Sequence, residues 1–424
     1  MCLTALPQFL RKTSPRRQSS SCVEHTNANF RSRPWPEVTG IMPKAPLFIT
    51  RYSLSLKNAI GVQTNLLLHP HPDWLHFFWS NPELGTGDPR SIRLENPVFG
   101  RVSFFQQKNP VVRNLQQLGL GWWKEDHLRP ELSKKLLHSY QNKISAIYAA
   151  PLEARDAKRI KQLVQIFKLP FVLHLWDFLD QRIRDNEDLC WLIHRAARIF
   201  CLSQPMLNEI APLRRDSEYL LFSRKPSRSF AVPPQGRSMR IVLLGNIHSY
   251  RQGLDLLDQA VERLVAKGIK MSVCYLGPQR KAFRSLDSPL VRRLEPLGFV
   301  KGDDNRDKVL SDFHVGFLPG PCTDPDVDMR SRYSIPSRIL DFLATGVPIV
   351  GTIRPDSATG IFCKSQGVDS HCFCQTSDDV AHALLQLLDQ SEWSHLAAKN
   401  REAFTRLTEN SQPEKLKRAM LCAV

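Results

Sequence analysis

Arg338 and Asp341 have the residue types and the spacing that most directly suggest chemistry. They lie three positions apart in YSIPSRILDFLATGVPIV, residues 333–350, so on a helix both side chains would share one face. The start of a helix suits an anion, because its N–H groups are free and its dipole is positive there. One helical turn rises about 5.4 Å, roughly the gap we estimate between a nucleotide's diphosphate and its ribose. The spacing is consistent with a nucleotide cradle or, alternatively, with a buried turn in which Arg338 pairs with Asp341.

The same segment predicts a short helix followed by a buried strand. Pro336 suits the first helical turn, where its missing N–H would have no partner. Gly346 would end the helix, whose apolar stripe consists of Ile339, Leu340, Phe342 and Leu343. The β-branched residues of Val347–Val350 predict the strand.

The formal net charge of +17 over 424 residues favours an anionic partner. The basic residues are dispersed and no zinc-finger or RNA-binding aromatic signature is found, so we expect no nucleic acid partner. A nucleotide, a phosphorylated lipid or an anionic membrane surface fits better, and a basic surface without a partner is the alternative. The ten cysteines are irregularly spaced and no secretory signal is recognisable, which predicts free thiols in the cytoplasm.

The length predicts two or three domains. Strand-like and helix-like segments alternate, which is typical of parallel α/β sheets, and a stretch rich in Pro, Ser and Arg at 223–238 interrupts them. We predict a disordered basic extension over 1–45, a Rossmann-like N-terminal domain over 46–230, a linker over 231–239, a Rossmann-like C-terminal domain over 240–410 and a tail over 411–424. The extension is either a transit peptide or sequence upstream of a true start at Met42.

The predicted elements follow from local patterns of apolar residues. Strands are expected at 46–50, 74–79, 98–105, 144–149, 170–175, 198–202, 240–244, 270–276, 297–300, 314–318 and 347–350. Helices are expected at 58–68, 153–167, 189–197, 204–211, 253–267, 378–389 and 391–408.

The second half of this order resembles the nucleotide-binding domain of retaining glycosyltransferases of the GT-B fold, the glycosyl transferases group 1 superfamily. The matching segments are RIVLLGN, GLDLLDQAVERL, LGFVKGDDNRDKVLSDFHVGFLPG and SIPSRILDFLATGVPIVGT. The last is similar to the family consensus S-x-P-x-K, x-x-E-Y, G-x-P-V-V. The first half matches only loosely, through its strand order and a His-x-x-Asp after a Pro-entered strand. The resemblance implies two Rossmann-like domains facing each other across a cleft, where ligands usually bind. It also implies that residues 46–230 form the acceptor domain and residues 240–410 the nucleotide-sugar domain.

The resemblance also implies a set of site residues. Asp341 takes the place of the family's second glutamate and would hold the ribose hydroxyls, while Arg338 would lie near the phosphates. The other implied donor-binding residues are Gly61, Asn246, Arg251, Val300, Ser334 and Ser337. The catalytic candidates are His174, Asp177 and Tyr333, and the alternative for His174 is a strand-end histidine bonded to a backbone carbonyl. The chain departs from the family at Tyr333, which replaces the first glutamate, and at Asn246, which replaces a loop arginine.

The implied activity is that of a hexosyltransferase-type enzyme in polysaccharide or glycolipid biosynthesis. It would move a sugar from a nucleotide-sugar donor to a glycan or lipid-linked acceptor with retention of configuration. A helix start with arginines can stabilise the departing diphosphate, so no cofactor and no metal are expected. The alternative is a Mg²⁺ or Mn²⁺ site at Asp326-Val327-Asp328.

Location and two further functions complete the predictions. The basic N-terminal half would suit a peripheral position at the inner face of an anionic membrane. A catalytically silent nucleotide-sugar or glycan-binding protein is one functional alternative, since Tyr333 replaces a glutamate. A nucleotide-sugar epimerase on the same fold is the other.

Overall fold

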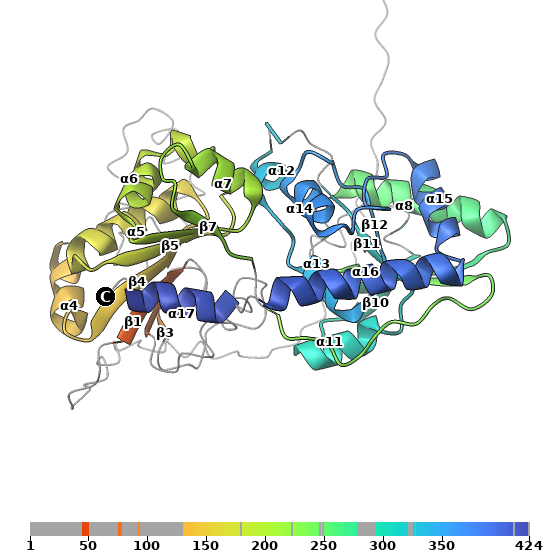
Figure 1. Cartoon of the computed structure of the whole chain (residues 1–424), viewed down its shortest axis with the longest axis horizontal. Helices are drawn as coiled ribbons and strands as arrows, with labels where there is room; N and C mark the ends of the chain where they lie inside the picture. Colours follow the sequence, from red (N-terminus) through yellow and green to blue (C-terminus); the bar gives the residue numbers. More distant parts are fainter. Residues whose placement is uncertain are drawn as a thin grey trace, which may run out of the picture. The chain divides into compact units, whose positions relative to one another are not determined.

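The protein consists of two parallel α/β sheets, as the sequence predicts (Figure 1). The computed structural model describes residues 45–50, 75–78, 91–93, 130–178, 180–221, 224–245, 247, 250–277, 290, 293–320, 325–326, 328–409 and 412–422. No helix in this part of the chain is both long enough and apolar enough to span a membrane. The predictions for 1–44, for the helix at 58–68 and for the strand at 98–105 lie outside the described residues.

The first sheet has seven parallel strands in the order β3-β2-β1-β4-β5-β6-β7. The strands are β1 (Ala45–Thr50), β2 (Leu75–Phe78), β3 (Ser91–Arg93), β4 (Ile144–Ala150), β5 (Phe171–Leu175), β6 (Arg198–Cys201) and β7 (Ser217–Tyr219). The helices between them are α4 (Pro130–Tyr140), α5 (Ala154–Phe167), the short 3-10 helix η3 (Ile183–Asp185), α6 (Glu187–Arg195) and α7 (Gln204–Ile210). Strands β1, β4 and β5 are almost entirely buried, which explains their continuous apolar sequences.

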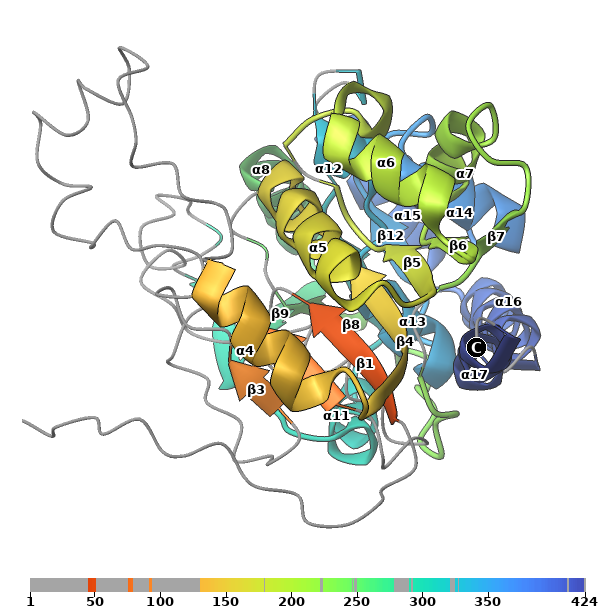
Figure 2. The same ribbon diagram turned by 90° about the vertical axis from the view of Figure 1, so that its left-hand side faces the viewer.

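The second sheet has five parallel strands in the order β10-β9-β8-β11-β12. Strands β8, β9 and β12 are labelled in Figure 2. The strands are β8 (Ser238–Leu244), β9 (Lys270–Leu276), β10 (Glu295–Gly298), β11 (Val315–Leu318) and β12 (Ile349–Gly351). The helices are α8 (Arg251–Ala266), α11 (Asp303–Leu310), α12 (Met329–Tyr333), α13 (Arg338–Thr345), α14 (Ala358–Gln366), α15 (Ser377–Gln386) and α16 (Gln390–Glu409). The chain order reverses between β8 and β11, which lie side by side in the sheet.

Helix α13 ends where the sequence predicts. Gly346 has φ +71°, a left-handed conformation that glycine adopts without steric cost, and its N–H bonds to the last carbonyls of the helix. The chain can therefore turn at once into β12. The strand begins at Ile349 rather than at Val347, so the predicted boundary is early by two residues.

The predicted elements given above do not include strands β3 and β7 or helices α4, η3, α11, α12 and α14. Strands β3 and β7 have only three residues each, too few to show an apolar period, and α4 has a weakly apolar sequence. The remaining predicted strands and helices of the described residues are present, with small shifts at their ends.

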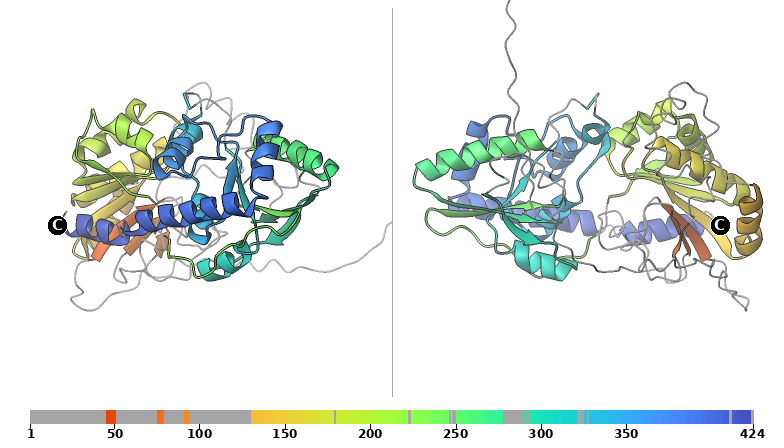
Figure 3. Two further views of the ribbon diagram at one scale, coloured as in Figure 1. Left: turned by 45° about the vertical axis from the view of Figure 1, so that its right-hand side comes forward. Right: turned by 180° about the vertical axis from the view of Figure 1, so that it is seen from behind.

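The end of the chain differs most from the prediction of a tail. It forms helix α17 (Gln412–Cys422), which contacts β4 and β5 of the first sheet (Figure 3). Leu416, Ala419 and Met420 belong to the same buried cluster as Tyr148 and Trp176. The first domain is therefore completed by the last residues of the chain, a long-range contact that no local pattern announces.

We predict that Leu416→Ala destabilises the protein by about 2–5 kcal/mol, because it removes fully buried methyl groups and leaves a cavity. The measurement is urea unfolding, and Lys417→Ala on the exposed side of α17 is the matched control, with an expected change of about 0.5 kcal/mol or less. Equal stability of the two variants would show that α17 contributes nothing to the first domain.

Candidate functional site

Arg338, the first residue of α13, points its guanidinium at the ends of two neighbouring strands. Its Nη1 donates to the carbonyl oxygen of Leu244 at 3.3 Å, and its Nη2 donates to that of Pro319 at 3.3 Å. The ring of Tyr250 covers the guanidinium, with the ring centroid 5.1 Å from Cζ. The side chain is thus buried and held in one orientation at the carboxyl edge of the second sheet.

This edge is where an open parallel sheet usually binds its ligand. The strand order reverses between β8 and β11, and a crevice opens outside the carboxyl ends of the strands at such a point. Leu244 ends β8, and Pro319 follows β11. Gly245 has φ +77° and so turns the chain away from the sheet without a side chain over the crevice. Arg338 therefore places a positive charge at the switch point of the second sheet.

The residues that precede α13 are partly accessible. Ser334, Pro336 and Ser337 are half-buried, and the Ser337 side chain makes no capping hydrogen bond to the helix. The positive end of the α13 dipole lies beside the Arg338 charge. This start of the helix therefore has the charge and the accessibility that suit an anionic group.

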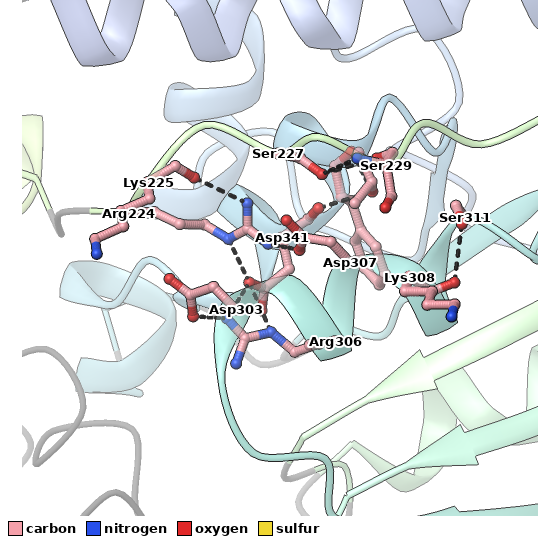
Figure 4. Close-up of polar contacts among 12 residues, drawn as sticks. Arg224, Lys225, Ser227, Ser229, Asp303, Arg306, Asp307, Lys308, Ser311 and Asp341 are labelled. Atoms are coloured by element: carbon pink, nitrogen blue, oxygen red, sulfur yellow. Dashed lines mark hydrogen bonds and ion pairs between the residues drawn. The ribbon is translucent and has the colours of Figure 1, made fainter.

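Asp341 lies one turn further along α13 and belongs to a buried ionic cluster of five residues (Figure 4). Its Oδ1 accepts hydrogen bonds from Arg224 Nε at 2.7 Å and from Arg306 Nε at 3.1 Å. Arg224 also bonds to Asp307, and Arg306 Nη2 donates to Asp303 at 2.7 Å. Three carboxylates thus face two guanidiniums, which leaves one negative charge in the cluster. The Arg338–Asp341 pair that the sequence allowed as an alternative is not among these contacts.

The two carboxylate oxygens of Asp341 have different hydrogen-bond partners. Both arginines contact Oδ1, and no described side chain donates a hydrogen bond to Oδ2. A net negative charge disfavours a phosphate there and favours groups that donate hydrogen bonds, such as hydroxyls. Asp341 can therefore accept from a ligand hydroxyl through Oδ2 without losing its partners.

Asp177 follows β5 in the first domain and reaches the second domain. The carboxylate lies near Ser334 and Arg330 of the second domain, whereas its Oδ1 is buried and has no hydrogen-bond partner among the described residues. Burial raises the pKa of Asp177, although Ser334 and the charge of Arg330 favour the ionised form. A buried carboxylate oxygen without a donor is costly, and such a cost is typical of a functional position.

His174 lies in the core of the first domain. Its Nε2 bonds to the carbonyl oxygen of Leu220 at 3.1 Å, and its Nδ1 accepts from Trp176 Nε1 at 2.7 Å. Burial lowers the pKa of His174 to about 3, so the ring is neutral at physiological pH. His174 is therefore a strand-end histidine bonded to a backbone carbonyl, which was the alternative to a catalytic role. Of the two catalytic candidates at the end of β5, Asp177 is the one that lies near the second domain.

Tyr333 connects the two domains. It is fully buried, its hydroxyl donates to Glu209 Oε2 of α7 at 2.6 Å, and it accepts from the N–H of Ile183 at 3.4 Å. Burial raises the pKa of the Tyr333 phenol above its usual range, so it is protonated at neutral pH. Tyr333 therefore acts as a hydrogen-bonding group between domains in this conformation, not as a base.

An open cavity of about 550 Å³ lies between α7, α12 and α14, next to Tyr333. Arg182 and Arg184 of the first domain, Arg332 of the second, and the polar side chains of Asn208 and Glu209 line it. Asp356, three prolines, a leucine and an isoleucine form the rest of its wall. The cavity presents hydrogen-bond donors and acceptors over an apolar surface, which suits a polyhydroxylated ligand.

The Asp326–Asp328 segment has structural roles. Asp326 forms ion pairs with Arg182 at 3.1 Å and Arg332 at 2.7 Å, and Asp328 caps α12 by accepting from the N–H of Arg330. Within the described ranges, no three His, Cys, Asp or Glu side chains come together to form a metal site.

The remaining predicted residues divide into two groups. Gly61 and Asn246 lie outside the described residues. Arg251 is exposed at the start of α8, directly after Tyr250, and Val300 is half-buried in the loop after β10.

The sequence analysis missed the partners of Asp341, above all Arg224 and Arg306. One signal was available for Arg306: α11 has charged residues at Asp303, Arg306 and Asp307 on one face but only a weak apolar stripe. Such a face needs charged partners if it packs inward. Arg224 gave no signal, since it comes from a segment whose composition resembles a linker.

The comparisons with known proteins agree with this architecture. The sequence matches no protein-family model and no curated protein. Among solved structures, HepE from Anabaena, in complex with UDP and glucose, has a TM-score of 0.59 at 12% identity, covering 90% of this chain and 100% of that one. The lipopolysaccharide outer core galactosyltransferase WaaB has a TM-score of 0.54 at 10% identity, with coverages of 90% and 100%.

A third similar structure is the trehalose-phosphate synthase of Burkholderia xenovorans in complex with glucose-6-phosphate. Its TM-score is 0.56 at 9% identity, covering 89% of this chain and 100% of that one. At these identities the likeness concerns the fold. The chain has the GT-B fold of two Rossmann-like domains that these glycosyltransferases share.

Proposed function

We propose that the protein is a glycosyltransferase that moves a sugar from a nucleotide-sugar donor to a glycan or glycolipid acceptor with retention of configuration. The observation that carries this proposal is the position of Arg338, buried on the strand-end carbonyls at the switch point of a GT-B fold. Asp341 lies one turn further on with Oδ2 available to a hydroxyl. Phosphates at the helix start and ribose hydroxyls at Asp341 would use both features.

The arrangement can support glycosyl transfer through charge stabilisation. As the glycosidic bond breaks, negative charge develops on the diphosphate, and Arg338 with the α13 dipole would stabilise it. The proposal requires no metal at this position. In the retaining reaction, the departing phosphate would take the proton of the acceptor hydroxyl. Asp177 would orient a hydroxyl of the acceptor or of the transferred sugar through its unpartnered oxygen.

The cavity beside Tyr333 is our candidate for the acceptor-binding region. Four of its six polar side chains, those of Arg182, Arg184, Asn208 and Glu209, come from η3, α7 or the residue before η3, and so from the predicted acceptor domain. The mixture of guanidinium, amide and carboxylate groups suits neighbouring sugar hydroxyls. Attachment to an anionic membrane surface and a cytoplasmic location stay predictions from composition and charge.

A second candidate function has a specific observation in its favour. Tyr333 stands where the resemblance predicts a glutamate, and its hydroxyl is engaged by Glu209 and Ile183. A protein that binds nucleotide-sugar without turning it over would be consistent with this substitution. Transfer and hydrolysis assays with UDP-, GDP-, ADP- and CMP-sugars and lipid extracts separate the two functions, since the second binds without product.

We predict that a saturating nucleotide raises the stability of the parent protein and that Asp341→Asn removes most of this effect. At a hundred times Kd, the expected stabilisation is about 2.7 kcal/mol. The measurement is a thermal-shift series with UDP, GDP, ADP and CMP. Asp312→Ala, an exposed carboxylate of the same domain, is the control and should respond as the parent does. An undiminished response of Asp341→Asn would contradict the ribose assignment.

We predict opposite effects of Asp177→Asn on stability and on turnover. Burial raises the folded pKa of Asp177 above its unfolded value of about 3.9. Ionisation therefore costs stability, and this cost is absent at low pH and complete above the folded pKa. The stability of the variant relative to the parent should accordingly rise as the pH increases from about 4 through the folded pKa. Its kcat/KM should fall about 10- to 100-fold if a charged hydrogen bond to substrate is lost.

Unfolding curves at several pH values and steady-state kinetics test this prediction. Asp180→Asn, an exposed carboxylate in the same loop, serves as the control. A pH-independent difference in stability together with unchanged turnover would remove Asp177 from the site.

A further inference from the structure

The segment between β7 and β8 does more than connect the two domains, because Arg224 inserts into the second one. Its guanidinium side chain is only 3% exposed. It contacts carboxylates on two different helices, Asp307 of α11 and Asp341 of α13, and lies over the ring of Phe404 of α16. The connecting segment is therefore anchored in the second domain through the same carboxylate that lies one turn from Arg338.

Arg306 approaches Asp341 from the other side of the cluster. Its Nη2 lies 2.9 Å from Oδ1 of Asp341 and 2.7 Å from Oδ1 of Asp303 (Figure 4). Two guanidiniums from different elements thus converge on one oxygen. A carboxylate that is fixed in this way has little freedom to rotate, so the direction of its second oxygen is also fixed.

We propose that Arg224 is a positioning residue for nucleotide recognition: it holds Asp341 by Oδ1 so that Oδ2 faces the ribose hydroxyls. Arg306 supports it from α11. The inference rests on the proposed function, since it concerns the same nucleotide site. It adds that ribose recognition depends on a residue of the segment between β7 and β8, where the sequence analysis predicted no site residue.

The distribution of bonds distinguishes this role from a purely structural ion pair. A bidentate arginine on a carboxylate would engage both oxygens, which is the strongest arrangement for stability. Here both arginines contact Oδ1 of Asp341, and Nη2 of Arg224 donates to Asp307 instead of to Oδ2 of Asp341. Lysine has a single point charge and cannot contact two carboxylates in this forked manner.

The experiment compares UDP and GDP with their 2′,3′-dideoxy counterparts, which lack both ribose hydroxyls. Isothermal titration calorimetry measures the affinity ratio for each pair in each variant. In the parent we expect the ribose nucleotide to bind about 10- to 100-fold more tightly than its dideoxy counterpart. This ratio corresponds to the loss of one or two hydrogen bonds to a charged group. Arg224→Met should reduce this ratio to about 1–3, and Arg224→Lys should give an intermediate ratio.

Two further variants protect the test against misfolding. Arg224→Met with Asp307→Asn removes the arginine together with one of its two buried carboxylates, and should also lose the ribose preference. Arg237→Met changes an exposed arginine of the same segment and should keep the ratio of the parent. Circular dichroism and melting temperature establish that each variant is folded.

The outcomes separate the inference from the proposed function. If the parent binds a nucleotide with ribose preference and the folded Arg224 variants keep the full ratio, the positioning role is overturned and the proposed function stands. If the parent binds none of the nucleotides, the proposed function and this inference fail together. An equal loss for ribose and dideoxy forms would mark Arg224 as merely structural and would also overturn the inference.

Discussion

The reversal of strand order between β8 and β11 is the constraint on which the candidate site depends. Neighbouring parallel strands leave carbonyl groups at their carboxyl ends, and where the connections diverge no following helix covers them. Here the guanidinium of Arg338 meets the carbonyls of Leu244 and Pro319. One side chain thereby satisfies buried backbone acceptors and places a positive charge at the same point of the sheet edge.

The ionic cluster around Asp341 is costly to build. Five charged side chains leave water, and desolvation of buried ions offsets much of their mutual attraction. The effect of burial is visible at Asp307, whose pKa it raises against the attraction of Arg224. A well-packed apolar group could occupy the same volume at lower cost. Selection for a charged oxygen in a fixed direction gives a physical reason for keeping the cluster.

Each domain of this protein is completed by residues from elsewhere in the chain. Arg224, from the segment after β7, is buried among helices of the second domain, and α17 packs in the core of the first. Between them, Tyr333 and Glu209 form a hydrogen bond from one domain to the other. Any change in the angle between the two sheets must therefore preserve or break such contacts.

Local physics explains what the sequence alone determined. The continuous apolar strands, the amphipathic helix α8, the left-handed stop at Gly346 and the shared face of Arg338 and Asp341 depend on residues close together in the chain, where period and propensity are decisive. Tertiary structure decided the rest. From the sequence, Asp341 was expected either to pair with Arg338 or to bind a ligand. In the structure its carboxylate accepts hydrogen bonds from Arg224 and Arg306, which lie 117 and 35 positions away in the chain. The structure also buries His174 in the core of the first domain and packs α17 against the first sheet. These outcomes depend on which residues, distant in the chain, pack together in the folded protein. The periodicity of apolar residues predicts which face of an element is buried, but it does not predict the partners of a charged side chain.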